Sequence, residues 1–212
     1  MTPLPRHGLY AITSAALCRE PARLVPAVEA ALRGGVAILQ YRDKHSPPAL
    51  RRRLAAQLLD VCRAARVPLL INDDLDLAAA LGADGVHLGQ TDASLVAARA
   101  VLAPQAVIGV TCHGSLERAL EAERNGASYV AFGAVYPSRT KPGAPVIGLS
   151  PLREHAARLQ LPVCAIGGIG AEHAGDVLAT GVRYLAAIEG VFGGADPEGA
   201  ARAYARHFPV AD

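Results

Sequence analysis

Gly35-Val36-Ala37-Ile38-Leu39-Gln40-Tyr41-Arg42-Asp43-Lys44 leads from a glycine turn through a short apolar run into a polar segment with two cations. The apolar run at residues 36–39 predicts a buried strand. Pro47-Pro48 follows, and residues 48–61 then carry leucines at the 3.6-residue spacing of one helix face. The stretch therefore predicts one strand–helix unit, and the cations where the strand ends indicate that something anionic is held there.

The same glycine-led turn into a strand recurs along the chain, at Gly82, Gly126 and Gly181. The steps from 35 to 82, 126 and 181 each cover about two strand–helix units. Eight short apolar runs, close to residues 8–13, 36–39, 68–71, 85–88, 107–110, 129–132, 163–166 and 183–188, alternate with helical patterns. We therefore expect a (β/α)₈ TIM barrel, α/β in class, as a single domain over residues 1–212. A doubly wound parallel sheet is the alternative.

Composition excludes several classes of protein. The chain has 212 residues and a formal net charge of +2, so bulk charge gives no case for nucleic acid or an anionic membrane as partner. Its four cysteines are scattered without a C-x-x-C pair, which favours reduced thiols over a disulfide framework or a zinc site. No apolar run is long enough for a bilayer span, and the N-terminus lacks an apolar signal core. We expect a cytoplasmic protein.

Polar residues gather where the predicted strands end, whereas glycine, proline and alanine precede them. In barrels of this kind the active site lies at the carboxyl ends of the strands. Three cations there, Arg42, Lys44 and Lys141, would surround an anion with fork and point charges. Any one of these cations, taken alone, is more typical of a solvated surface residue. Lys141 belongs to a long irregular stretch at residues 133–149, and such loops are often functional.

Asp73 and Asp92 follow neighbouring strands on the same rim as the cations. Two carboxylates there repel each other unless they share a cation, and Mg²⁺ takes few carboxylates while keeping waters and substrate phosphate oxygens. The alternative is that one aspartate caps a helix and the other is a solvated turn residue. We favour a Mg²⁺ site.

A second anion site is indicated at Gly167-Gly168, which follows the seventh predicted strand. Barrels commonly build a phosphate cradle near strands seven and eight, at a helix N-terminus. His113 is open to two interpretations, a hydrogen-bonded structural residue or a substrate contact or base. His87, in the middle of a strand, is interpreted as a buried structural residue. One diphosphate site and one monophosphate site suggest a transferase that displaces diphosphate.

Five motifs together resemble the thiamine-phosphate synthase family, in the right order and over nearly the whole chain. They are Gln40-Tyr41-Arg42-Asp43-Lys44, Ile71-Asn72-Asp73-Asp74, Gly85-Val86-His87-Leu88-Gly89-Gln90-Thr91-Asp92, Ser138-Arg139-Thr140-Lys141 and Ile166-Gly167-Gly168-Ile169. The resemblance implies a (β/α)₈ barrel that joins 4-amino-5-hydroxymethyl-2-methylpyrimidine diphosphate to 4-methyl-5-(2-phosphoethyl)thiazole. The products would be thiamine phosphate and diphosphate. Diphosphate leaves first in the family's dissociative mechanism, and no covalent enzyme nucleophile is needed.

The resemblance also assigns site residues. Those implied for the pyrimidine diphosphate are Gln40, Tyr41, Arg42, Asp43, Lys44, Asn72, Thr111, Ser138, Arg139, Thr140 and Lys141. Arg42, Lys44, Thr111 and Lys141 among them are expected to be catalytic. Asp73 and Asp92 would hold Mg²⁺, and Gly167, Gly168 and the backbone of Ile188 and Glu189 would bind the thiazole phosphate. A homodimer is expected from the family alone.

Two residues depart from the family pattern, and two other functions compete. Thr111 and Glu189 occupy positions where the family often has serine; threonine keeps the hydroxyl, but Glu189 beside a phosphate needs an outward side chain. The enzyme alternative is the related thiazole tautomerase, which has a histidine matching His113 and does not need the paired carboxylates. The other alternative is a non-catalytic phosphate-binding barrel. Asp43 either orients its cationic neighbours or faces solvent.

Overall fold

Eight parallel strands close into one barrel in the computed structural model, which describes residues 1–89, 93–137, 143 and 145–209. Each strand pairs with its neighbours in chain order, and β8 closes the ring on β1. The strands are β1 Gly8–Ile12, β2 Val36–Tyr41, β3 Leu69–Asn72, β4 Gly85–Leu88, β5 Val107–His113, β6 Tyr129–Phe132, β7 Val163–Ile166 and β8 Tyr184–Ala187. This topology confirms the predicted (β/α)₈ barrel and rules out the doubly wound sheet.

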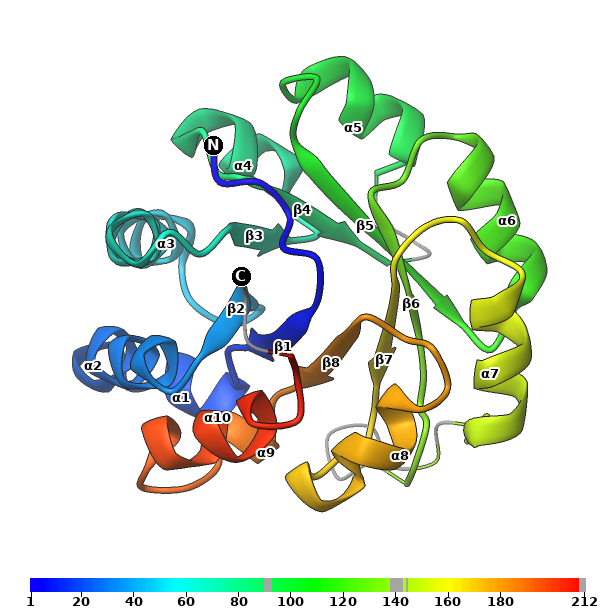
Figure 1. The fold of residues 1–212 in the computed structure, drawn as a ribbon. Coiled ribbons are helices and arrows are strands. Elements are labelled where there is room, and N and C mark those ends of the chain that lie inside the picture. The colour runs from blue at the N-terminus through cyan, green and yellow to red at the C-terminus, as the bar shows by residue number, and fades with distance from the viewer. Residues whose placement is uncertain (90–92, 138–142, 144, 210–212) are drawn as a thin grey trace.

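The helices form an outer ring around the strands (Figure 1). They are α1 Ala15–Cys18, α2 Pro21–Arg33, α3 Pro48–Ala65, α4 Leu75–Leu81, α5 Leu95–Val101, α6 Leu116–Arg124, α7 Leu149–Ala157, the 3₁₀ turn η1 Ala171–His173, α8 Ala174–Leu178, α9 Glu189–Phe192 and α10 Pro197–Ala205. Sequence patterns do not predict α1 or α9, since one turn is too short to show a helical period. In the described part of the chain no helix is long and apolar enough to cross a membrane.

Two strands run further than the sequence predicts. β2 continues through Gln40 and Tyr41, and β5 continues to His113. Polarity suggested that these strands had already ended, but the register pairs Gln40 with Ile12 and His113 with Phe132. A strand in a closed barrel continues its backbone hydrogen bonds for as long as a neighbouring strand is there to pair with it, whatever the polarity of its side chains. Two polar residues are consequently held by rigid backbone.

Alternation along each strand divides the core in two. Leu9 and Ala11 of β1 point outward into the layer between strands and helices, whereas Tyr10 and Ile12 point into the barrel. The outer layer is built mostly of Leu, Val and Ala. The inner cluster is smaller and includes three tyrosines, Tyr10, Tyr129 and Tyr184. Interior hydroxyls need partners, and these partners shape the site described below.

One glycine makes room for an inner tyrosine. Gly109 of β5 stands opposite Tyr129 of β6 in the register, and a β-carbon at position 109 would overlap the phenol ring of Tyr129. The sequence gives no sign of this requirement, because a glycine within a strand looks only like a weak strand residue.

The N-terminal ends of the strands are tied to the segment that precedes β1. The Tyr184 hydroxyl donates to the Pro5 carbonyl, and the buried Asp84 carboxylate accepts from the backbone amides of Thr2 and Leu69. These bonds lie at the end of the barrel opposite to the predicted site, where they serve stability.

We predict that Gly109→Ala lowers the free energy of unfolding by about 1–3 kcal/mol, the usual cost of overpacking a core. The added methyl must displace the Tyr129 ring. Gly194→Ala is the matched control, because a β-carbon there meets no atom within 4 Å. Urea denaturation of both variants tests the prediction, which fails if they are equally stable.

Candidate active site

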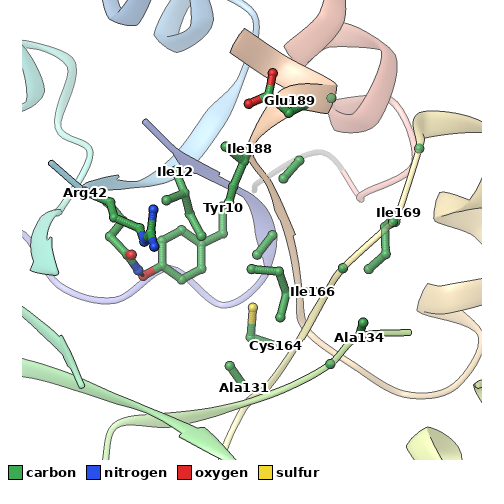
Figure 2. A pocket seen from close by; sticks show the side chains of 18 of the residues that line it. Tyr10, Ile12, Arg42, Ala131, Ala134, Cys164, Ile166, Ile169, Ile188 and Glu189 are labelled. Carbon is green, nitrogen blue, oxygen red and sulfur yellow. Dashed lines mark hydrogen bonds between the residues drawn. The ribbon is translucent and has the colours of Figure 1, made fainter. Parts of the chain in front are cut away.

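A cavity of about 830 Å³ opens at the carboxyl ends of the strands. Every strand contributes to it, together with the loops after β2, β6, β7 and β8. Figure 2 shows Arg42 and Tyr10 on one side, the apolar Ile166, Cys164 and Ala131 across from them, and Glu189 at the edge. The predicted site residues that line the cavity are Gln40, Arg42, Asn72, Thr111, Gly167, Gly168, Ile188 and Glu189, and His87 and His113 line it as well.

Arg42 is held by a buried threonine. The Thr13 hydroxyl accepts from the Arg42 amide at 2.8 Å and lies 3.3 Å from the Arg42 carbonyl oxygen. This pair of contacts fixes the backbone just beyond β2, while the half-buried side chain reaches the cavity. Within the described residues the Arg42 guanidinium has no hydrogen-bond or ion-pair partner. It is a cation available to an anionic ligand.

Four predicted site residues do not line the cavity: Tyr41, Asp43 and Lys44, which the resemblance assigned to the substrate, and Asp73, which it assigned to Mg²⁺. The buried Asp43 carboxylate accepts from the Tyr41 hydroxyl at 2.9 Å and from the backbone amides of His45 and Ser46 at 3.0 Å each. These bonds fold the turn that carries Lys44. The structure therefore explains Asp43 as the residue that shapes the cationic loop, the first of the two possibilities left open by the sequence.

Burial alone would raise the pKa of Asp43, but the hydrogen bonds from Ser46, His45 and Tyr41 outweigh burial and lower it. The carboxylate is therefore ionised at neutral pH, and its charge holds the turn in place.

Lys44 and Asp73 meet at the rim, as the barrel prediction requires of residues that follow neighbouring strands. The Lys44 ammonium lies 2.8 Å from a carboxylate oxygen of Asp73, whose side chain is 24% exposed. Asp73 has φ of 62°, a left-handed conformation that non-glycine residues rarely adopt, although aspartate adopts it more readily than most. Helix capping at this position falls to Asp74, whose carboxylate accepts from the Leu77 amide. Asp73 is therefore not the cap of α4, and its carboxylate lies at the rim.

The residues near Asp73 fit a hard cation. A Mg²⁺ ion commonly takes one or two protein carboxylates and fills its remaining positions with water and substrate oxygens. Asp73 offers one partly exposed carboxylate, and the neighbouring Asn72 lines the cavity. No group of three or more His, Cys, Asp or Glu residues gathers among the described parts of the chain.

Hydrogen-bonded side chains cross the barrel interior from one cavity wall to the other. The Gln40 amide nitrogen bonds to the Tyr10 hydroxyl, which lies 2.7 Å from the Tyr129 hydroxyl. Nδ1 of His87 is 2.7 Å from the same Tyr129 oxygen, and its Nε2 is 2.8 Å from the Thr111 hydroxyl. His87 is buried and hydrogen-bonded as the sequence suggests, and it also reaches the cavity. We call this set of five side chains the relay.

The other end of the cavity is built from backbone. Gly167 and Gly168 have φ of 100° and 66°, and β-carbons there would collide with Ala134 and with Tyr136 and Pro137. Glycine is thus required by close packing of the loop after β6, independently of any ligand. The Glu189 side chain is exposed, with a carboxylate oxygen near Gly193, and Figure 2 shows its carboxylate turned away from the apolar wall.

Five predicted site residues lie outside the described residues: Asp92, Ser138, Arg139, Thr140 and Lys141. Their roles remain predictions. Sequence reasoning in turn missed Tyr10 and Tyr129. A signal was present, because both tyrosines stand among apolar residues in strands that were predicted to be buried, where a hydroxyl needs a partner.

Comparisons with known proteins give relatives in sequence and in fold. A family model described as thiamine monophosphate synthase matches residues 9–191. A thiamine-phosphate synthase from Methylococcus capsulatus is 50% identical over 200 residues, which are 94% of this chain and 88% of that protein. The structure of thiamine phosphate pyrophosphorylase from Pyrococcus furiosus has a TM-score of 0.86 at 36% identity, with 95% of each chain covered. A 3-hexulose-6-phosphate synthase, at 20% identity and a TM-score of 0.68, covers 96% of this chain and 100% of its own, and shares the fold alone.

We predict a pH-dependent cost for Asp43→Asn. The ionised form of Asp43 stabilises the fold above its unfolded pKa, and this contribution is lost as pH falls through the lower folded pKa. The variant should lose about 1 kcal/mol of unfolding free energy at pH 7, a typical hydrogen-bond contribution, and the gap should close below about pH 4.

Denaturation at pH 7 and pH 3 measures the gap. Asp60→Asn, which changes an exposed carboxylate on α3, controls for net charge. A gap of the same size at both pH values would contradict the role given to Asp43.

Proposed function

We propose that this chain, which belongs to the thiamine monophosphate synthase family, carries out its reaction in the described cavity. As a member of this family, the chain is a transferase that forms thiamine phosphate. The route that we propose joins the pyrimidine diphosphate to the thiazole phosphate by a dissociative substitution. The observation that carries it is the position of Arg42, a cation without a described partner in a cavity whose far wall is apolar.

In this proposal the diphosphate lies at the β2–β3 side of the cavity. Arg42 offers a fork of donors and Lys44 a point charge, and the turn folded by Asp43 holds Lys44 beside Asp73. Asn72 and Gln40 line the same side and would contact the diphosphate and the ring. Ser138, Arg139, Thr140 and Lys141 would complete the pyrimidine diphosphate site from the loop after β6.

Asp73 and Asp92 would hold Mg²⁺ beside the diphosphate. When bound, the ion would neutralise phosphate charge and make diphosphate a better leaving group. The Lys44–Asp73 pair is compatible with this role, because a diphosphate next to a divalent ion needs both positive and negative partners nearby.

The thiazole phosphate would lie at the opposite end, on the backbone of Gly167, Gly168, Ile188 and Glu189. The left-handed turn at Gly167 and Gly168 suits an anion held by backbone N–H groups. The exposed Glu189 carboxylate, beside Gly193, need not face the phosphate.

The bond change would take place between these two ends. Diphosphate leaves with the electron pair of the C–O bond, and Arg42 and Lys44 hold its charge, together with Lys141. The thiazole nitrogen then shares its lone pair with the pyrimidine-methyl cation. The apolar wall of Ala131, Ile166 and Ile188 would keep water from that cation. Thr111 also lines the cavity.

Covalent catalysis by the cavity thiol is disfavoured. Cys164 lines the cavity, but burial raises the pKa of its thiol far above neutrality. The thiolate is the nucleophilic form of cysteine, so Cys164 stays inert. This property is in keeping with a mechanism that needs no enzyme nucleophile.

We predict that Arg42→Ala lowers kcat/KM at least about a hundredfold, as loss of a transition-state charge contact does. Diphosphate release from the two substrates is the measurement, and Arg124→Ala, an exposed change on α6, is the control. Near-wild-type release by Arg42→Ala would remove this residue from the diphosphate site. A thiazole tautomerase would isomerise its substrate without releasing diphosphate.

We also predict that turnover depends on Mg²⁺. EDTA should abolish diphosphate release and added Mg²⁺ should restore it, because the proposed leaving group carries several negative charges. Asp73→Asn should raise the Mg²⁺ concentration that gives half-maximal rate by about tenfold or more, since metal ligands commonly contribute at least as much as their outer partners. Turnover that is indifferent to EDTA would contradict the role of the metal.

A further inference from the structure

The relay connects two cavity walls through one side chain, Tyr129, that does not line the cavity. Tyr129 is fully buried and is absent from the cavity lining, whereas its partners Tyr10 and His87 both line the cavity. The inference drawn from this arrangement rests on the proposed function, since it concerns how the pyrimidine ring is recognised.

Every member of the relay is hydrogen-bonded when donation runs in one direction, from Gln40 to Thr111. The Gln40 amide nitrogen donates to the Tyr10 oxygen, so the Tyr10 proton goes to Tyr129. The Tyr129 proton then goes to Nδ1 of His87, which must accept. In this order His87 is the neutral tautomer with its proton on Nε2, and it donates to the Thr111 hydroxyl. Burial raises the pKa values of Tyr10 and Tyr129, so both phenols keep the protons that this order requires.

The direction of donation determines what Gln40 offers to a ligand. Its amide nitrogen is committed to Tyr10, and its carbonyl oxygen has no hydrogen-bond partner among the described residues. If the amide turned over, its oxygen would accept from Tyr10, and every proton along the relay would have to reverse. The orientation of the amide is thus coupled to the order of protons in its buried partners.

We propose that Tyr129 is a positioning residue for substrate recognition: through Tyr10 it keeps the carbonyl oxygen of Gln40 available to accept a hydrogen bond from the exocyclic amino group of the pyrimidine. A ring with a carbonyl oxygen in place of that amino group would meet a second acceptor and be rejected. Such unpaired polar groups are how sites discriminate strongly between ligands of similar shape.

Packing leaves the Tyr129 hydroxyl little freedom. The ring stacks on His87 at 5.6 Å between centroids and meets Tyr10 and Tyr184 edge-on at 5.8 Å and 5.9 Å. A β-carbon at Gly109 would overlap the hydroxyl end of this ring. The hydroxyl is therefore fixed between Tyr10 and His87, and a change there acts on the ligand only through those neighbours.

Tyr129→Phe tests the proposal, with Tyr184→Phe as its matched control. Both variants remove one phenolic oxygen from the same aromatic cluster, but the Tyr184 hydroxyl bonds to Pro5 outside the relay. Titration calorimetry would measure the Kd of the aminopyrimidine diphosphate and of its hydroxy analogue, in Mg²⁺ and without the thiazole phosphate. Diphosphate release with both substrates would be followed separately.

Without Tyr129's hydroxyl, Tyr10 can turn its proton to the Gln40 carbonyl oxygen, and the amide can present its nitrogen instead. We expect the preference for the amino ring over the hydroxy ring to fall about tenfold in Tyr129→Phe, the factor that corresponds to one hydrogen bond. Tyr184→Phe should keep the wild-type ratio. The ratio of the two Kd values is the informative quantity, because a general loosening of the fold weakens the binding of both ligands alike.

An unchanged ratio in a folded Tyr129→Phe variant, or an equal loss for both ligands, would overturn the proposal. If Tyr129→Phe does not fold, Tyr10→Phe, which removes the direct partner of Gln40, must lower the ratio instead. Absence of diphosphate release by the wild-type protein would refute the proposed function, while the binding ratio would still decide the role of Tyr129.

Discussion

The inside of an eight-stranded barrel has room for few side chains, and any polar group placed there must find a partner within it. Here three tyrosines, a histidine and a glutamine share that space. Four of these five polar side chains, all but Tyr184, bond to one another and to Thr111. The arrangement is possible because Gly109 leaves space for the Tyr129 ring. Groups at the floor of the cavity are consequently oriented by the core itself.

Closure of the ring supplies the second requirement of the site, which is a rim where residues distant in sequence meet. Lys44 follows β2 and Asp73 follows β3, and their side chains form an ion pair. Local bonds then refine each position: Thr13 holds the backbone of Arg42, and Asp43 folds the turn before Lys44. The cationic rim therefore depends on anchoring residues as much as on the charges.

Sequence patterns predicted a large part of this structure. The apolar runs that became β4, β6 and β7 stand out, because glycine or proline precedes them and polar residues or glycine follow. Rim residues such as Arg42, Asn72 and Thr111 were likewise predicted, since strand ends can be located from these runs. The hydrogen bonds that form the relay could not be predicted, because they join five strands and depend on which face of each strand points inward. Asp43 shows the same limit: its partners are close in sequence, but only the turn geometry shows that its carboxylate faces them.

In the proposed function the pyrimidine diphosphate lies between the Gln40–Lys44 stretch and the apolar wall of the cavity. A crystal structure with the reaction products and Mg²⁺ bound would test it most directly. We expect diphosphate against Arg42 and Lys44, the aminopyrimidine ring beside Gln40, and the thiazole phosphate at Gly167 and Gly168. Diphosphate at the Gly167 end, or products bound outside the cavity, would contradict it.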